Sequence, residues 1–570
     1  MLTTLTAPAF AGTWYIEDGD ITISAGESGN NVTQNENTTV NDPDTIITNR
    51  EEGASSHTVT IDAKDKDDKV EVTLKDVNID ASSRSEAAVS VTGKGDTTIE
   101  LDGNNELQGG DRHAGLEHNQ TVDSEGNVTS GKLTIQDDND NAGSLTATGG
   151  YFGAGIGGGS AKAGQVTITG GTITAISGDG AGIGGGQGNM GSNAGNADIE
   201  ISGGTIEATG GYASAGIGGG TWGDANIKIT GDAVIKNATG GVYGSGIGGG
   251  GGGNGDVTIS GNAKIENAQG GITGSGIGGG NGASGTVVIK DDSTVTATGG
   301  EAGAGIGGGY AGLGDVTIEG NTMVNATGGV GSAGVGGGYG AENDEDGNGS
   351  QITIKSNESG SPNVTATGGE SSIDEETKEK IPGGAGIGSG VGDAKANITL
   401  EGKVTIVAKG GEGNAAIGDM NGEQVFTGLD GSITRYDSEG NDTTLPTDPG
   451  YPVPADTSSS GGSADASVQE SVFPGLVVTD KDGQRISYTS IRGNNVLSIR
   501  VGRFTASLRA SLATLRQLRA EGIDTITFQT ILCSTTLSVD ELLAMGGEDT
   551  EVVLTHHIRS STLTVGGKAV

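Results

Sequence analysis

The sequence predicts an all-β protein, a right-handed parallel β-helix (a solenoid), followed by a small C-terminal α+β domain. Three observations carry this prediction: 114 of the 570 residues are glycine, a glycine-rich string recurs about every 30 residues, and each repeat holds three short segments in which apolar and polar residues alternate. Glycine at this density disfavours helices, because each one costs about 1 kcal/mol relative to alanine. Glycine does not fall at every third position and proline is rare, so the chain is not a collagen.

The first residues resemble the end of a secretion signal. Residues 1–11 finish in Ala9-Phe10-Ala11, the small-x-small pattern that signal peptidase cleaves. The single cysteine, Cys533, excludes an intrachain disulfide. We therefore expect an exported bacterial protein, secreted or held at the cell surface; the alternative is an ordinary disordered N-terminus.

Residues 12–150 have the pattern of diverged coils of the same helix. Their short alternating segments lie at residues 70–74, 77–79, 88–91, 98–101 and 133–135.

Residues 151–430 carry the repeat itself, the string Ala-Gly-Ile-Gly-Gly-Gly or a close variant. Its central aliphatic residue stands at Ile156, Ile183, Ile217, Ile247, Ile277, Ile306, Val335, Ile387 and Ile417. Between copies lie an alternating segment, such as residues 256–261, and another that ends in Ala-Thr-Gly-Gly, such as residues 294–300. Three strands per repeat describe one coil of a parallel β-helix, with coils about 4.8 Å apart, inward Val and Ile ladders, and glycine at corners that need positive φ.

Residues 70–80 (VEVTLKDVNID), 87–107 (AAVSVTGKGDTTIELDGNNEL) and 131–150 (GKLTIQDDNDNAGSLTATGG) resemble calcium-containing, carbohydrate-binding right-handed β-helix proteins of Gram-positive anaerobes. The AGIGGG coils are similar to coils in many exported proteins of gut Gram-positive bacteria. The resemblance covers about residues 60–420. It implies an extracellular protein that binds plant-type or acidic polysaccharide and holds Ca²⁺ through carboxylates.

Composition changes after the last repeat. Residues 431–475 contain Pro446, Pro449, Pro452, Pro454 and Pro474 and a Ser/Gly stretch, which predicts a linker.

Residues 476–570 then predict a small α+β module. Leu508, Leu512, Leu515 and Leu518 have the spacing of an amphipathic helix that ends at Gly522. A strand is expected at residues 525–530, a capping box at residues 538–541 opens a short helix, and strands follow at residues 552–554 and 563–565.

Charge and hydropathy exclude several functions. The formal net charge of −42 argues against nucleic-acid binding through phosphate neutralisation, because the chain would repel a polyanion. No window approaches 18 consecutive apolar residues, so no transmembrane helix is expected.

A polysaccharide lyase or hydrolase is disfavoured, because such enzymes need clustered carboxylates or a basic residue beside the substrate. No arginine lies between His113 and Thr434, and no histidine between Asn119 and Thr555. The conspicuous Asp256 and Asp315 recur once per coil at a strand start, as turn-capping residues do, and are not paired as a catalytic dyad.

Two acidic loops are the candidate calcium sites, because hard oxygen ligands on flexible loops suit Ca²⁺. The candidate ligands are Asp137, Asp138 and Asp140 in one loop and Asp344 and Asp346 in the other. Neither loop has EF-hand spacing, and solvated acidic loops are the alternative.

The rare aromatic residues are the candidate carbohydrate site. Beside Phe152, the rings that flank the glycine-rich string are Tyr151, Tyr212, Trp222, Tyr243, Tyr310 and Tyr339. Equivalent places on successive coils would put these rings in a row along one edge, where they can stack on sugars. The alternative is that the rings only cover the apolar rim of the coils.

These observations together predict a non-catalytic, adhesin-like protein that binds a polysaccharide or cell-surface glycan, with Ca²⁺ as a supporting ion. Two alternatives stay open: a structural stalk that presents the C-terminal module, and a polysaccharide lyase or hydrolase.

Overall fold

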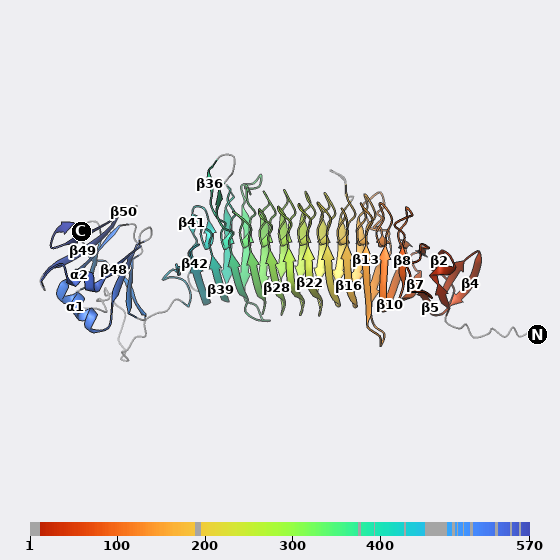
Figure 1. Cartoon of the computed structure of the whole chain (residues 1–570), viewed down its shortest axis with the longest axis horizontal. Helices are drawn as coiled ribbons and strands as arrows, with labels where there is room; N and C mark the ends of the chain where they lie inside the picture. Colours follow the sequence, from red (N-terminus) through yellow and green to blue (C-terminus); the bar gives the residue numbers. More distant parts are fainter. Residues whose placement is uncertain are drawn as a thin grey trace, which may run out of the picture. The chain divides into compact units, whose positions relative to one another are not determined.

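The computed structural model describes residues 12–188, 195–373, 378–392, 394–426, 429–450, 476–480, 485–486, 488–493, 495–501, 505–530, 534–547, 550–557 and 560–569. The predicted signal segment, residues 1–11, and Cys533 lie outside these residues. The chain forms two units, Met1–Tyr451 and Pro452–Val570, and each has its own hydrophobic core. The first unit is a parallel β-solenoid of about 15 turns, which confirms the predicted fold class (Figure 1).

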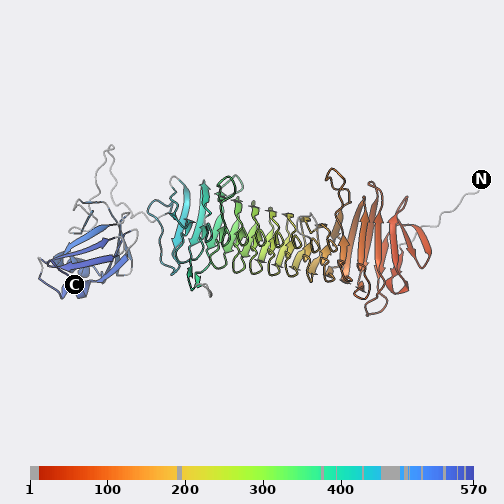
Figure 2. The ribbon, with the colours of Figure 1, turned by 90° about the horizontal axis from the view of Figure 1, so that it is seen from above.

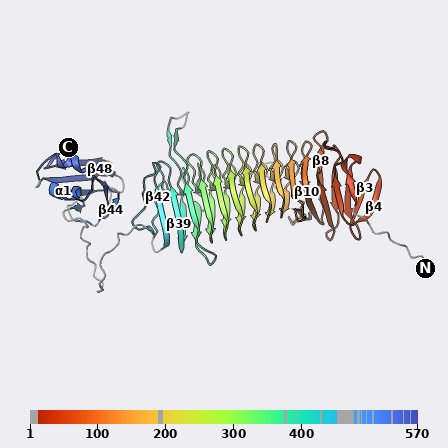
Figure 3. The same ribbon diagram turned by 60° about the horizontal axis from the view of Figure 1, so that its bottom comes forward.

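Each glycine-rich coil contains three strands. In one coil these are β20 (Ile217–Gly218), β21 (Ala225–Ile229) and β22 (Val234–Thr239). The two-residue β20 belongs to a 16-stranded sheet, here called the narrow sheet. The strands β21 and β22 lie in two further sheets, here called the first and second sheets, which join through the long β10 (Asp96–Gln108) into one 24-stranded sheet. Figure 3 shows the strands of successive coils side by side.

The strands of the three sheets follow one another along the chain. The narrow sheet contains β2 (Ile21–Ala25), β6 (Val59–Ala63), β9 (Val89–Gly93), β11 (Leu116–His118), β14 (Ile156–Gly157), β17 (Ile183–Gly184), β20, β23 (Ile247–Gly248), β26 (Ile277–Gly278), β29 (Ile306–Gly307), β32 (Val335–Gly336), β37 (Ile387–Gly388) and β40 (Ile417–Asp419). The first sheet contains β1 (Thr13–Tyr15), β5 (Thr45–Thr48), β7 (Lys69–Lys75), β12 (Leu133–Gln136), β15 (Gly164–Ile168), β18 (Ala197–Ile201), β21, β24 (Gly255–Ile259), β27 (Gly285–Ile289), β30 (Gly314–Glu319), β33 (Ser350–Lys355) and β38 (Ala396–Glu401). The second sheet contains β8 (Asn78–Asp80), β13 (Gly143–Thr148), β16 (Thr172–Ile176), β19 (Thr205–Thr209), β22, β25 (Lys264–Gln269), β28 (Thr294–Thr298), β31 (Met323–Thr327), β34 (Asn363–Thr367), β39 (Lys403–Lys409) and β42 (Asp430–Tyr436).

The register of the stack is the one that the repeat predicts. The central aliphatic residues of the glycine-rich string pair coil by coil from Ile156 to Ile417, and all of them are buried. A second ladder runs through the first sheet, where Ile227 pairs with Val257 and Val257 with Val287. Since no coil can bury these side chains alone, each coil is stabilised by its two neighbours.

The narrow strand requires glycine after its aliphatic residue. In nine coils this glycine has φ between +128° and +150°, a conformation that side chains rarely adopt. Space is short as well: a Cβ on Gly278 would lie 2.1 Å from the carbonyl oxygen of Gly307 in the next coil.

Polar side chains tie coils together where the chain enters the first sheet. The Oδ1 atom of Asp224 accepts from the backbone N–H of Asn254 at 2.7 Å, and the Oδ1 of Asn254 accepts from the N–H of Ser284 at 3.0 Å. The ladder continues to the N–H of Leu313, which donates to the Ser284 hydroxyl at 3.1 Å. Each side chain thus satisfies a donor that the strands leave free.

Asn254→Ala is expected to lower the free energy of unfolding of the solenoid by about 1 kcal/mol, because the N–H of Ser284 loses its acceptor. Urea unfolding followed by circular dichroism measures the change. The control is Thr258→Ala, in the middle of β24 and outside the ladder; an equal loss in both variants would show that the ladder adds nothing specific.

Elements outside the repeat lie at both ends of the solenoid. At the N-terminal end, β3 (Asn30–Gln34) and β4 (Asn37–Asp42) add antiparallel strands to β2. The buried Asp42 accepts from the indole Nε1 of Trp14 at 2.9 Å and from the Thr45 hydroxyl at 3.1 Å. A one-turn 3₁₀ helix, Ile16–Asp18, precedes β2.

At the C-terminal end, β41 (Gly422–Glu423) pairs antiparallel with β40, and β42 adds the last strand of the second sheet. In that strand Arg435 occupies the ladder position of Ala408 and is fully buried. Residues 430–450 therefore belong to the solenoid, whereas the sequence places them almost entirely in a linker over residues 431–475. The prolines Pro446 and Pro449 lie in a loop that closes the stack.

A short antiparallel pair, β35 (Ser372–Ile373) and β36 (Lys380–Ile381), projects from the solenoid between β34 and β37.

The described residues of the second unit form two sheets and two helices. One sheet has the order β43 (Val477–Thr479), β46 (Ala506–Ser511), β49 (Glu551–His557), β50 (Ser560–Val565) and β51 (Lys568–Ala569). The other has the order β44 (Thr489–Gly493), β45 (Val496–Arg500), β47 (Thr525–Gln529) and β48 (Ser534–Ser538). The helices are α1 (Leu512–Ala520) and α2 (Val539–Leu543).

The predicted elements of this unit are present with shifted bounds. The expected helix starts later than predicted, because Leu508 lies in β46 and the Ser511 hydroxyl caps α1 by accepting from the N–H of Thr514. The strand at residues 525–530 and the Ser538 cap of the second helix are confirmed.

Candidate functional site

Two loops flank each narrow strand and form one continuous edge of the solenoid. Around β20 the leading loop is residues 210–216 and the trailing loop is residues 219–224. The two kinds of loop bond to each other across coils. The N–H of Gly251, in a trailing loop, donates to the carbonyl oxygen of Ala213 at 2.7 Å, and Ala213 lies in the leading loop of the preceding coil. Leading and trailing loops together are called the loop edge below, and Figure 2 shows the loops of successive coils following one another along the stack.

The loop edge carries every ring that the sequence analysis selects. The rings form pairs rather than the evenly spaced row expected. Tyr151 and Phe152 meet edge to face at 4.5 Å between centroids, Tyr212 and Tyr243 meet at 5.2 Å and 90°, and Tyr310 and Tyr339 stack at 5.9 Å and 29°. Trp222 stands by itself in a trailing loop.

Four of these rings are too exposed to serve only as a cover for the coils, whereas Phe152, Tyr243 and Tyr339 are partly buried. Tyr151 is 61% exposed, Tyr212 is 56% exposed, and Trp222 and Tyr310 are each 40% exposed. A ring that only sealed the apolar rim would be buried by it, since burial is the source of hydrophobic stabilisation.

The backbone of Trp222 is in a left-handed conformation, with φ of +60°. The equivalent residues of other coils are small, for example Ala161, Gly252, Gly282 and Ala311. A bulky side chain at positive φ costs about 1–2 kcal/mol, so fold stability does not explain the choice of tryptophan. The left-handed backbone conformation places an exposed indole on the edge.

Trp222 and Tyr243 pack against the backbone of Gly251-Gly252. A Cβ on Gly252 would lie 2.1 Å from the indole Cε3 of Trp222, and one on Gly251 would lie 2.8 Å from the Cβ of Tyr243. The N–H of Trp222 donates to the carbonyl oxygen of Gly251 at 2.8 Å, which fixes the two loops against each other. The two glycines therefore leave the space in which these side chains lie against the loop.

The hydroxyl of Tyr212 donates to the hydroxyl of Tyr243 at 3.4 Å. This hydrogen bond raises the pKa of Tyr212 above its ordinary value, so the phenol is neutral at pH 7. The hydroxyl of Tyr243 is the acceptor of this bond. The three side chains Tyr212, Trp222 and Tyr243 can therefore offer ring faces for stacking and a hydroxyl for hydrogen bonding.

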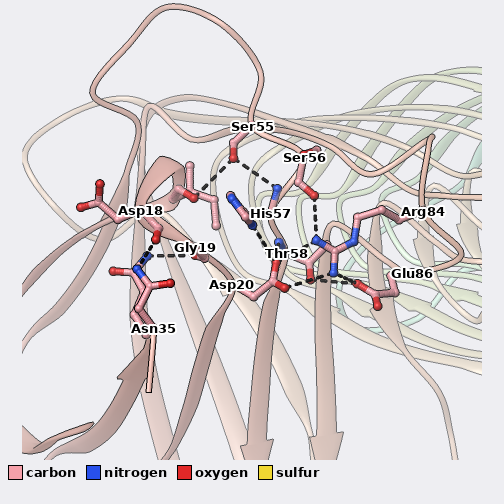
Figure 4. Close-up of polar contacts among 12 residues, drawn as sticks. Asp18, Gly19, Asp20, Asn35, Ser55, Ser56, His57, Thr58, Arg84 and Glu86 are labelled. Carbon is pink, nitrogen blue, oxygen red and sulfur yellow. Dashed lines mark hydrogen bonds and ion pairs between the residues drawn. The ribbon is translucent and has the colours of Figure 1, made fainter. Parts of the chain in front are cut away.

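The N-terminal part of the loop edge is charged instead of aromatic, and sequence reasoning did not select it. Asp20, which precedes β2, accepts from the N–H of Thr58 at 2.9 Å and from Arg84 Nη1 at 2.9 Å (Figure 4). Arg84 also pairs with Glu86 at 2.6 Å, and His57 Nδ1 lies 3.2 Å from Asp20. Partial burial raises the pKa of Asp20, but the hydrogen bonds from Arg84 and Thr58 outweigh it and lower the pKa overall.

One coil further on, His113 Nδ1 lies 2.8 Å from Glu117 Oε2. Glu117 also accepts from the N–H of Ala114 and from the amide of Asn119, and its hydrogen bond raises the pKa of His113. The contacts of Asp20 with Thr58 and Arg84 join different coils and so brace the diverged N-terminal coils, whereas the contacts of Glu117 lie within the coil of β11. The concentration of histidine and arginine before residue 119 was the signal for them in the sequence.

In the residues that the structure describes, the carboxylates of the two acidic loops are not gathered into a group of three or more that could hold a metal ion. In the loop after β12 the carboxylate of Glu100 accepts from the N–H groups of Asp138 and Asn139 at 2.8 and 3.0 Å, which fixes the conformation of the loop. Asp137 Oδ1 is buried without a hydrogen-bond partner, yet no three His, Cys, Asp or Glu side chains gather to hold a metal in the described part of the chain, so neither Asp137 nor Asp140 joins such a set.

In the second acidic loop, Asp344 Oδ1 accepts from the N–H groups of Asp346 and Asn348 at 3.0 and 2.7 Å. The hydrogen bonds from Asn348 lower the pKa of Asp344. Asp344 therefore stabilises a turn within its own loop, as acidic residues in solvated loops commonly do.

Comparison with known proteins supports the repeat. A family model described as a beta helix repeat matches residues 141–160, 166–187, 199–221 and 287–310. The comparison with curated proteins found no match, and neither did the comparison with solved structures. Across the residues that the structure describes, no helix has the length and apolar character needed to cross a membrane.

Proposed function

We propose that this chain is an exported, non-catalytic polysaccharide-binding protein whose loop edge stacks on the sugars of a neutral glycan. The observation that carries the proposal is the group formed by the exposed rings of Tyr212 and Trp222 and the partly buried ring of Tyr243 on neighbouring loops of this edge. Sugar rings combine an apolar face with hydroxyls, and flat aromatic rings beside hydrogen-bonding groups complement both.

A neutral glycan fits the charge of the protein better than an acidic one. The net charge of −42 repels a polyanion. A bound Ca²⁺ could bridge the protein to an anionic glycan, but the candidate calcium ligands do not gather into a group of three or more in the described residues. Rings and uncharged loops dominate the edge around Tyr212 and Tyr243. We therefore expect binding that does not depend on Ca²⁺.

The first experiment measures binding of the full chain to insoluble and soluble polysaccharides, both neutral and acidic, with Ca²⁺ and again with EDTA. Retention on a neutral member, unchanged by EDTA, is the expected result. Retention on acidic members alone, lost with EDTA, would favour the calcium-supported reading that the family resemblance implies. Binding to no member would overturn the proposal and leave the solenoid as a stalk for residues 476–570.

Single alanine substitutions at Tyr212, Trp222 or Tyr243 are each expected to weaken binding to the retained polysaccharide about tenfold, the loss of about 1.4 kcal/mol of ring contact. Alanine suits position 222, because Ala161 and Ala311 occupy the equivalent positive-φ positions. The control is Tyr436→Ala, which removes a ring from β42 in the second sheet. Affinity purification on the polysaccharide and calorimetry measure the effect; undiminished binding in all three variants would show that the rings are not the site.

A further inference from the structure

Tyr212 and Tyr243 stand on the leading loops of two neighbouring coils and meet through the ends of their rings that carry the hydroxyl groups. We infer that this pair is a site of oxidative cross-linking, where a one-electron oxidant joins the two phenol rings into a dityrosine bridge between the coils. The inference does not depend on what the loop edge binds.

The side-chain geometry brings the reacting atoms together. The two hydroxyl oxygens lie 3.4 Å apart, and the ring centroids lie 5.2 Å apart at an angle of 90°. In a phenoxyl radical the unpaired electron is shared between the oxygen and the ortho carbons, which flank the carbon that carries the oxygen. Contact between the two hydroxyls therefore also brings ortho carbons of the two rings close to each other.

The backbone holds the pair in this arrangement. The N–H of Tyr243 donates to the carbonyl oxygen of Tyr212 at 3.3 Å, and in the strands that follow Ile217 pairs with Ile247. Two residues that are 31 positions apart in the sequence are thus fixed side by side. Such proximity favours reaction within one chain over reaction between chains.

The pair is open to an oxidant from solution, because Tyr212 is 56% exposed and Tyr243 is only partly buried. The other rings of the loop edge are less suited to coupling. Tyr151 lies against Phe152, which has no hydroxyl, and Tyr310 and Tyr339 stack at 29° with centroids 5.9 Å apart, so that their faces are turned toward each other.

The coupling balances with hydrogen peroxide as the oxidant and a haem peroxidase as its catalyst. Each phenol gives up one electron and its hydroxyl proton, and the two radicals combine to form one bond between ortho carbons. The hydrogen on each of these carbons then moves to the phenol oxygen, which restores both aromatic rings. One peroxide takes up the two electrons and two protons and leaves as two water molecules.

A bridge at this place would tie coil to coil covalently. The chain has a single cysteine, so no intrachain disulfide can do this. A cross-link between positions distant in sequence restricts the opened state and so opposes opening of the coils that it joins. Hydrogen exchange in the peptides that contain β20 and β23 is therefore expected to slow about tenfold after coupling.

The test treats the full chain, at high dilution, with hydrogen peroxide and a haem peroxidase. The expected product is a monomer with dityrosine fluorescence, in which mass spectrometry finds the peptides of residues 212 and 243 linked and lighter by two hydrogen atoms. Tyr243→Phe is expected to remove this linked peptide and to lower the fluorescence of the monomer at least about fivefold, because Tyr212 loses its fixed partner. Tyr339→Phe is the matched control, since it removes a phenol from the stacked pair, and it is expected to keep the bridge and the slower exchange.

Cross-links found only between separate chains would overturn the inference. So would monomer fluorescence that is unchanged in Tyr243→Phe, or that falls equally in Tyr339→Phe. Oxidation of Trp222 without a linked peptide would overturn it as well, because the oxidant would then have reached the loop edge without joining the pair. A bridge that forms without slowing exchange in β20 and β23 would show that it does not tie the coils together.

Discussion

Gly278→Ala is expected to break the solenoid open locally, with a loss of about 3 kcal/mol or more in the stability of the coils around it. The added Cβ would lie 2.1 Å from the carbonyl oxygen of Gly307, and the backbone φ of +129° disfavours any side chain. Neither problem can be relieved by a rotamer change, because the obstacle is the backbone of the next coil. The neighbouring coils must shift apart, which breaks bonds such as that from the N–H of Ile277 to the carbonyl oxygen of Gly305.

Peptide-resolved hydrogen exchange measures this effect, since it reports opening coil by coil. Protection should fall first in the peptides that contain β23, β26 and β29. The matched control is Gly282→Ala in the same coil, where the Cβ has free space and φ of +71° costs only about 1 kcal/mol. Equal protection in the two variants would refute the view that close coil contact selects glycine in the narrow strand.

Arg435→Met is expected to destabilise the C-terminal end of the solenoid by about 3–5 kcal/mol. The fully buried guanidinium donates to the buried Asp448 twice, from Nε at 2.6 Å and from Nη2 at 2.9 Å. It also pairs with Glu423 and donates to the carbonyl oxygen of Gln424 at 2.8 Å. Methionine fills similar space but leaves Asp448 as a buried carboxylate without its cation.

Loss of the guanidinium also reaches the last coil of the narrow sheet. Glu423, which Arg435 holds in place, accepts the N–H groups of Ala416 and Ile417 at 2.6 and 3.0 Å, donors that a further coil would otherwise satisfy. Hydrogen exchange should therefore rise first in β40 and β42 and spread toward the N-terminus. Arg50→Gln, which removes an exposed arginine that stacks on Tyr15, is the control and should leave these peptides unchanged. Unchanged protection in Arg435→Met would show that the end of the stack does not need the buried cation.

The repeated part of the fold was predictable because each contact recurs. The aliphatic residues from Ile156 to Ile417 occupy one ladder, and their spacing in the sequence is enough to place them in register. The ends were not predictable by the same reasoning, since Arg435 and the β3–β4 hairpin occur once each. Pro446 and Pro449 have linker composition, and only the position of Asp448 beside Arg435 shows that their loop belongs to the solenoid.

The candidate site was predictable in its location and not in its arrangement. Period and motif placed the rings on one edge, but the pairing of Tyr212 with Tyr243 depends on side-chain directions in neighbouring loops. The acidic loops show the opposite case. Composition suggested metal ligands there, while the turn geometry around Asp344 gives that carboxylate local donors.

The number of stacked coils sets the length of the solenoid, because the elements at its two ends occur once each. The β3–β4 hairpin lies at the N-terminal end of the solenoid and the buried Arg435 at the C-terminal end, and neither belongs to the repeat. Because a coil touches only its neighbours, duplication of one repeat would insert a rung without changing either cap. Duplication or deletion of a coil would therefore lengthen or shorten the loop edge by one coil at a time.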